Sequence, residues 1–214
     1  MRYNIIILFL FISCFANSQS IFINYGKANT SFIYTDENGN NLDEFKADNL
    51  DQSAIGYEFV LPNNFNIKTS ISSNNYASKS INQDYSWHMS YIGLDFKGVY
   101  YILLNKNDTN EINKIGGLKF LLSSGFISSF MTSGSQRIDN EIYDLSEFND
   151  GSFNNLFMLS LGTGIQYPIN KSTLICLGYS YYRGINNMES NRQSLYVQSQ
   201  NIFLELKINI NEKK

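Results

Sequence analysis

The chain alternates between apolar and small or polar residues over almost its whole length. Between residues 158 and 182 the apolar row comprises Leu159, Leu161, Thr163, Ile165 and Tyr167, and, after the four residues 168–171, Thr173, Ile175, Leu177, Tyr179 and Tyr181. A period of two is typical of a β-strand, whose side chains point alternately to opposite faces, and the four-residue interruption predicts a hairpin. The alternation therefore predicts strands, and the question that remains is which row is buried.

Residues 1–18 have the features of a secretory signal peptide. Arg2 precedes an unbroken apolar run from Ile5 to Ile12, and Ala16-Asn17-Ser18 supplies the small residues of a cleavage site. The apolar run is far shorter than the roughly 20 residues that a membrane-spanning helix needs. We therefore expect a cleaved signal peptide, 1–18, followed by one domain, 19–214.

The composition of the expected mature chain excludes several classes of protein. Cys176 is its single cysteine, so an internal disulfide framework is excluded. The net charge of −3 gives no sign of nucleic-acid binding. An exported chain of alternating strands then belongs to one of two classes. It is either a soluble β-protein of the periplasm or the exterior, or an outer-membrane β-barrel, whose strands need only about 9–11 residues each.

The spacing of the strands and their links favours the barrel. Eight segments are predicted as strands: 20–34, 52–61, 65–76, 87–103, 117–131, 153–167, 172–183 and 198–210. Links 62–64 and 168–171 are short, whereas links 35–51, 77–86, 132–152 and 184–197 are long and polar, with 104–116 as the exception. Short turns at one end and long loops at the other are typical of outer-membrane barrels and not of Greek-key sandwiches. The predicted fold is an all-β, eight-stranded antiparallel transmembrane barrel of up-and-down topology.

In such a barrel the apolar row faces lipid and the small, polar row fills a narrow lumen. The row expected inside carries charges of both signs: Glu58, Lys68, Asp95, Lys97, Lys119, Glu205 and Lys207. Buried charges are costly unless they are paired, so we predict a closed polar network. Seven aromatic residues are interpreted as girdles at the two membrane interfaces: Trp87, Tyr91, Tyr100, Tyr101, Tyr167, Tyr179 and Tyr181.

Three segments resemble the PorT-like family of small outer-membrane β-barrel proteins. They are "IGYEFVLPNNFNIKTSISSNNY" (55–76), "MSYIGLDFKGVYY" (89–101) and, most closely, "LGTGIQYPINKSTLICLGYSYYRGINN" (161–187). The resemblance covers nearly the whole expected mature chain. It implies a small outer-membrane barrel and, by analogy with the family's namesake, an accessory role in a protein-secretion system.

Two of the long loops are strongly acidic and hold 11 of the chain's 19 acidic residues. The first includes Asp36, Glu37, Asp43 and Glu44, and the second includes Asp139, Glu141 and Asp144. One interpretation is a pair of solvated loops. The other is a cation-dependent surface, which contacts lipopolysaccharide through divalent cations or contacts a basic protein partner.

The residues indicate no catalytic, metal or cofactor site. His88 is the only histidine, which argues against a metal site and against a Ser/His/Asp set. Segment 35–45 is similar to a calcium loop, but Asn41 and Ala47 stand where glycine and a bidentate glutamate are needed. We expect a non-enzymatic, monomeric barrel without cofactor or nucleic-acid partner, in contact with outer-membrane lipid. The alternatives are a secretion accessory and a lipid-modifying outer-membrane enzyme.

Overall fold

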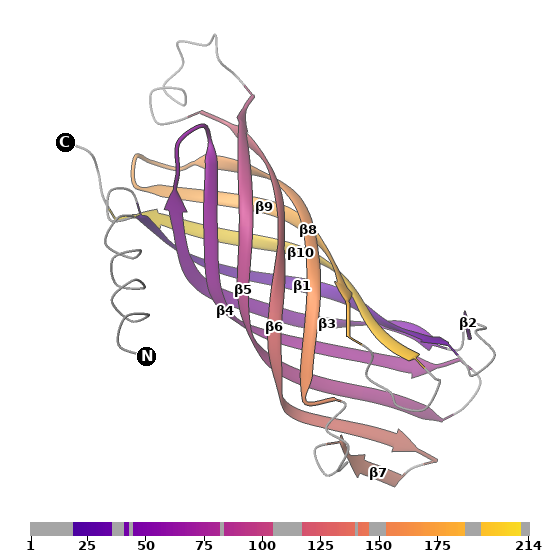
Figure 1. The fold of residues 1–214 in the computed structure, drawn as a ribbon. Coiled ribbons are helices and arrows are strands. Elements are labelled where there is room, and N and C mark those ends of the chain that lie inside the picture. The colour runs from indigo at the N-terminus through magenta and orange to yellow at the C-terminus, as the bar shows by residue number, and fades with distance from the viewer. Residues whose placement is uncertain are drawn as a thin grey trace, which may run out of the picture.

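A computed structural model of the chain contains eight long antiparallel strands (Figure 1). It describes residues 19–35, 41–42, 45–81, 84–104, 117–139, 141–145, 153–186 and 194–210. The long strands are β1 (Gln19–Thr35), β3 (Phe45–Val60), β4 (Phe65–Ser80), β5 (Tyr85–Leu103), β6 (Lys119–Ile138), β8 (Asn155–Pro168), β9 (Thr173–Gly184) and β10 (Ser194–Asn209). Two short strands, β2 (Asn41–Leu42) and β7 (Glu141–Asp144), extend the sheet at one end. Within these ranges, no helix is long and apolar enough to cross a membrane.

The sheet closes on itself because the first and last long strands pair. β1 runs antiparallel to β10 from Ser20↔Asn209 to Thr35↔Ser194, and every other long strand pairs with its neighbours in chain order. Closure removes both free edges of the eight-stranded sheet, so each barrel strand has hydrogen-bonding partners on both sides. The predicted eight-stranded, antiparallel, up-and-down barrel is confirmed.

The apolar row of each strand faces outwards, as the alternation predicts. Leu177 is 60% exposed and Ile202 is 62% exposed, whereas their inward-pointing neighbours Cys176 and Asn201 are buried. The same arrangement holds around the whole barrel, where the exposed apolar residues include Ile23, Ile55, Ile71, Leu94, Phe126, Leu161, Leu177 and Leu204. These side chains form a continuous apolar belt, which is the surface that a lipid bilayer requires.

The strands continue well beyond this belt, and there the two faces exchange character. On β10 the outward row passes from Leu204 and Ile202 to Gln200 and Gln198, while the inward row passes from Glu205 to Val197. β5 changes in the same way on the N-terminal side of residue 91. The long strands have 12 to 20 residues, against the roughly 9–11 that a bilayer needs. The barrel therefore has a membrane part, whose interior holds the charged residues beside a small apolar cluster that includes Val99, Leu121 and Phe203, and an aqueous part whose interior is mainly apolar.

This extension corrects three of the predicted links, 77–86, 35–51 and 132–152. Link 77–86 is not a long loop, because β4 and β5 stay paired as far as Lys79↔Ser86 and only residues 81–84 connect them. Likewise β3 begins at Phe45, and β6 runs on to Ile138. Polar outward residues resemble loop residues in the sequence, but in water they suit a strand whose other face is buried.

The aromatic residues divide between the two faces, so the girdle interpretation is only partly correct. Tyr100, Tyr167 and Tyr179 are exposed on the outside of the barrel, as a girdle requires. The girdle interpretation is wrong for Trp87, Tyr91 and Tyr101, which are at most 5% exposed and point into the barrel.

The short turns and the described ends of the chain lie at one end of the barrel, opposite β2 and β7 (Figure 1). Turn 61–64 joins β3 to β4, and turn 169–172 joins β8 to β9. Asn63 and Asn64 have φ angles of 64° and 61°, in the left-handed region that asparagine tolerates better than most residues. By the usual layout of such barrels, this turn end lies in the periplasm and the opposite end lies outside the cell.

We predict that the lipid belt ends between Leu204 and Gln200 on β10. Leu204→Arg should reduce the free energy of unfolding by about 2–4 kcal/mol, because it places a cation in hydrocarbon. Gln200→Arg changes the same face of the same strand four residues further on, in water, and should have little effect. Denaturant titration in lipid vesicles measures both, and equal losses would contradict the position of the belt.

Candidate functional site

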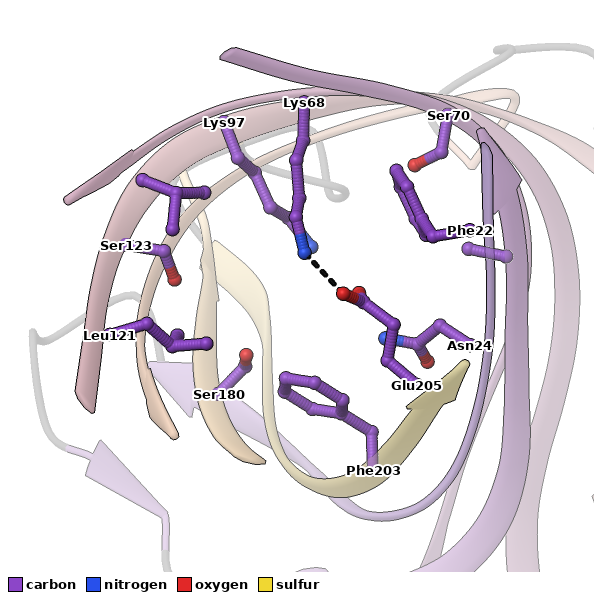
Figure 2. A pocket seen from close by; sticks show the side chains of 12 residues that line it. Phe22, Asn24, Lys68, Ser70, Lys97, Leu121, Ser123, Ser180, Phe203 and Glu205 are labelled. Carbon is purple, nitrogen blue, oxygen red and sulfur yellow. Dashed lines mark hydrogen bonds and ion pairs between the residues drawn. The ribbon is translucent and has the colours of Figure 1, made fainter. Parts of the chain in front are cut away.

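Four charged residues of the lumen lie near its turn end and form one network. Glu58 and Lys68 stand opposite each other on β3 and β4, while Glu205 and Lys207 come from β10. Lys68 Nζ lies 2.5 Å from Glu205 Oε1 and 3.5 Å from Glu58 Oε2, and Lys207 Nζ lies 2.5 Å from Glu58 Oε2. Figure 2 shows Lys68 and Glu205 meeting across the lumen. The barrel thus brings together four residues that lie up to 149 positions apart in the sequence.

Neutral polar side chains complete the hydrogen bonding of this network. Tyr101 Oη donates to Glu58 Oε1 at 2.8 Å, and the amide of Asn66 donates to the same oxygen. Lys207 Nζ donates to Tyr101 Oη at 2.7 Å and to Gln166 Oε1 at 2.8 Å. Buried ion pairs are tolerable only when additional hydrogen bonds satisfy their remaining donors and acceptors, and here Glu58 and Lys207 have such bonds.

A second charged pair lies further towards the outside. Asp95 and Lys97 are two residues apart on β5, so both point inwards, and Lys97 Nζ lies 3.6 Å from Asp95 Oδ2. Ser72 Oγ donates to Asp95 at 2.7 Å. Lys97 Nζ also lies 3.3 Å from Tyr182 Oη and 5.2 Å from the centre of its ring. Figure 2 shows Lys97 beside Lys68, with which it is paired in register on the neighbouring strand.

Lys119 is the lumen lysine that stands apart from these pairs. It begins β6 at the turn end, and its Nζ lies 5.8 Å from the centre of the Tyr101 ring. It forms no ion pair with any residue in the described parts of the chain. The structure therefore brings six of the seven charged residues into ion pairs and leaves Lys119 at the mouth of the lumen.

An apolar cluster fills the outer half of the lumen, and we call it the apolar plug. Its members are Phe32, Tyr76, Trp87, Met89, Tyr91, Ile127, Leu145, Phe153, Leu156, Met158, Tyr182, Leu195 and Val197. The rings of Phe32 and Trp87 meet edge to face with their centres 5.2 Å apart. Tyr91 Oη donates to the carbonyl of Phe153 at 2.9 Å, so a buried hydroxyl is satisfied inside the plug.

The space left in the lumen is unevenly distributed. A cavity of about 30 Å³ lies between Lys68, Lys97 and Glu205, which is room for about one water molecule. A larger pocket of about 370 Å³ lies at the turn end and is lined by residues that include Glu58, Tyr101, Lys119 and Lys207.

The predicted acidic surface is only partly described. Asp36, Glu37, Asp43 and Glu44 lie outside the described residues, as does the expected signal peptide, 1–18. Asp139, Glu141 and Asp144 are exposed at the outer end, and Tyr143 Oη donates to Glu141 at 2.5 Å. That hydrogen bond to a carboxylate raises the pKa of the Tyr143 hydroxyl.

Two acids assigned to the first acidic loop lie instead on β3 and are already paired with lysines. Asp51 lies 2.6 Å from Lys27 Nζ, and Asp48 lies 3.2 Å from Lys79 Nζ. The pKa of Asp51 lies below its usual value because Lys27 and then Tyr25 donate hydrogen bonds to its carboxylate. These two carboxylates therefore contribute less negative charge at the outer end than the sequence suggests.

Sequence reasoning missed the neutral partners and the plug. Tyr101, Asn66 and Gln166 hold the charged network together, and each occupies an inward position of its alternating strand. The alternation also continues beyond Ser90 with Met89 and Trp87 inside, which was the available sign of the plug. His88 is exposed on β5, and the described ranges contain no group of three His, Cys, Asp or Glu residues that could hold a metal ion.

We predict that Glu58 holds the lumen network together. Glu58→Gln leaves Lys207 and Lys68 without their shared carboxylate and should reduce the free energy of unfolding by about 3–5 kcal/mol. Asp51→Asn breaks an exposed ion pair on the same strand and should leave stability nearly unchanged. Denaturant titration in vesicles measures both variants, and an unaltered Glu58→Gln protein would show that the network contributes little.

Comparisons with known proteins give similarity of fold only. No protein-family model matches the sequence, and no curated protein matches it. Neisserial surface protein A is 12% identical, with 88% of this chain and 96% of that chain covered and a TM-score of 0.47. OprG from Pseudomonas aeruginosa is 11% identical, with 90% and 97% covered and a TM-score of 0.49. Ail of Yersinia pestis, solved in complex with the heparin analogue sucrose octasulfate, is 13% identical, with 90% and 99% covered and a TM-score of 0.42.

The class of the protein follows from its strand pairing and its outer surface. The similar solved structures are not needed for this conclusion. In hydrocarbon every backbone N–H and C=O group needs a partner within the protein, and a closed barrel supplies one. A closed barrel that presents apolar side chains around its whole circumference is suited to lipid and not to water. The protein is an eight-stranded β-barrel of the outer membrane.

Proposed function

We propose that the protein is a non-enzymatic, non-conducting barrel that acts through its outer end, by contact with lipopolysaccharide or with another protein. The observation that carries the proposal is the apolar plug. Its thirteen buried residues fill the lumen above the charged network, where a channel would need a polar path.

The size of the lumen supports the same conclusion. An eight-stranded barrel has an interior that side chains can fill, unlike the 16 to 18 strands of a porin. Here the central cavity of about 30 Å³ has room for about one water molecule, and cross-lumen ion pairs bound it. A hydrated ion or a solute would have to break those pairs and then displace the plug.

The outer end offers the surface for contact. The strands carry the barrel beyond the belt, and the outward residues of β5 and β10 there are mostly polar. Asp139 and Glu141 are exposed at the β6–β7 connection. Carboxylates at this end can share divalent cations with the phosphates of lipopolysaccharide.

We predict no steady conductance. Purified mature protein should give no open-channel current in planar bilayers, while a 16-stranded porin in the same bilayers gives large steps. Steady, large conductance from the purified protein would contradict the proposal.

We also predict that binding to lipopolysaccharide depends on Mg²⁺. The double variant Asp139→Asn/Glu141→Gln should lose most of the binding that EDTA removes, measured by co-sedimentation with lipopolysaccharide vesicles. The control, Asp48→Asn/Asp51→Asn, removes two carboxylates that lysines already neutralise and should keep the Mg²⁺-dependent part. Binding that is insensitive to EDTA, or equal in both variants, would count against the acidic surface.

The resemblance to PorT-like barrels supplies the alternative proposal, an accessory role in a protein-secretion system. A pull-down in mild detergent distinguishes the two roles. Enrichment of secretion components would favour the accessory role, and a lipid-modifying activity that one carboxylate substitution abolishes would favour an enzyme.

A further inference from the structure

We propose that the turn end of the lumen is a blind pocket that binds a compact anion through a carboxylate or phosphate group, with Lys119 as its principal cation. This inference concerns the periplasmic end and is independent of the role proposed for the outer end.

The pocket has the size and lining of a site for a small polar ligand. Its volume of about 370 Å³ lies at the lower end of the range of small-molecule sites. Its lining is largely polar and includes Ser20, Asn64, Asn66, Gln166, Lys119 and Lys207. Such a lining favours an ion or a strongly hydrophilic molecule over an apolar one.

The pocket is closed at its inner end. Glu58 and Lys207 line it there, and their ion pairs with each other and with Lys68 cross the lumen. Beyond these lie the 30 Å³ cavity and then the apolar plug. A ligand therefore enters and leaves from the turn end, which lies in the periplasm, and is held there without being transported.

The net charge of the lumen predicts whether the ligand is an anion or a cation. Among the described residues, the lumen carries four lysines, at positions 68, 97, 119 and 207, against three carboxylates, at 58, 95 and 205. Every carboxylate is paired, and Glu58 is shared by Lys68 and Lys207. One positive charge is left over, at the end where the pocket opens. A cation would meet this excess charge, whereas an anion neutralises it.

Lys119 is the lysine of the pocket whose N–H groups can still donate hydrogen bonds to a ligand. Lys207 already donates to Tyr101 and Gln166 and is paired with Glu58, so its three N–H groups are in use. Lys119 is half-buried in the pocket wall, its ammonium lies 5.8 Å from the centre of the Tyr101 ring, and it forms no ion pair or hydrogen bond with another described side chain. A half-buried ammonium binds an anion more strongly than a fully hydrated one, because less water competes for it.

The test is a titration of the mature protein in nonionic detergent at constant ionic strength, with sodium phosphate in one arm and sodium acetate in the other. Amide chemical shifts of Lys119 and Gln166 are followed by NMR. We expect saturable shifts in at least one arm, which identifies phosphate or carboxylate as the recognised group. Shifts that stay linear in both arms would overturn the proposal.

Three variants locate the site. Lys119→Gln should weaken the saturable binding at least tenfold, while Lys119→Arg should retain it because the charge remains. Lys171→Gln removes an exposed lysine from a turn at the same end, outside the pocket lining, and should bind as the unaltered protein does. Resistance of each variant to unfolding in cold detergent confirms that it is folded. Equal affinity of folded Lys119→Gln and Lys171→Gln would show that Lys119 does not hold the anion.

Discussion

The pairing of β1 with β10 is the interaction on which the rest of the structure depends. A sheet in hydrocarbon cannot leave a row of N–H and C=O groups without partners, so the eight strands have to close. Closure at eight strands then sets a narrow lumen that side chains fill. The outward row must match lipid, and whatever polar residues the membrane part contains must point inwards and satisfy one another there.

That requirement explains why the charged residues form a network and why the network ends where the membrane part ends. Glu58, Lys68, Glu205 and Lys207 are held in ion pairs because each would be costly to bury alone. Above the belt the outer surface meets water, and polar residues can face outwards again. The interior of this part is apolar like that of a soluble protein, which produces the plug. One set of continuous strands thus encloses the charged network in the membrane part and the apolar plug beyond it, and the plug separates the network from the outside.

The alternation alone predicts the membrane part well, because lipid demands an apolar residue at every second position. Leu177 and Ile202 are outside and Glu58 and Lys207 are inside, as expected. It predicts neither the start of β3 nor the ends of β4 and β6, because a polar outward row resembles a loop in the sequence. It also does not predict the inward position of Trp87. The contact between Glu58 and Lys207 depends on the register around the closed barrel, through β1. A pattern within one strand contains no information about that register.

The central claim is that the faces of continuous strands exchange character at the edge of the belt, and spin labels along β5 test it most directly. Labels are placed one at a time at the outward positions 96, 94, 92, 90, 88 and 86 in vesicles. Their relaxation by oxygen is compared with relaxation by a water-soluble nickel complex. The account predicts that oxygen dominates as far as Ile92 and that the nickel complex dominates from Ser90 onwards. Oxygen dominating as far as position 86, or the nickel complex dominating at every position, would contradict it.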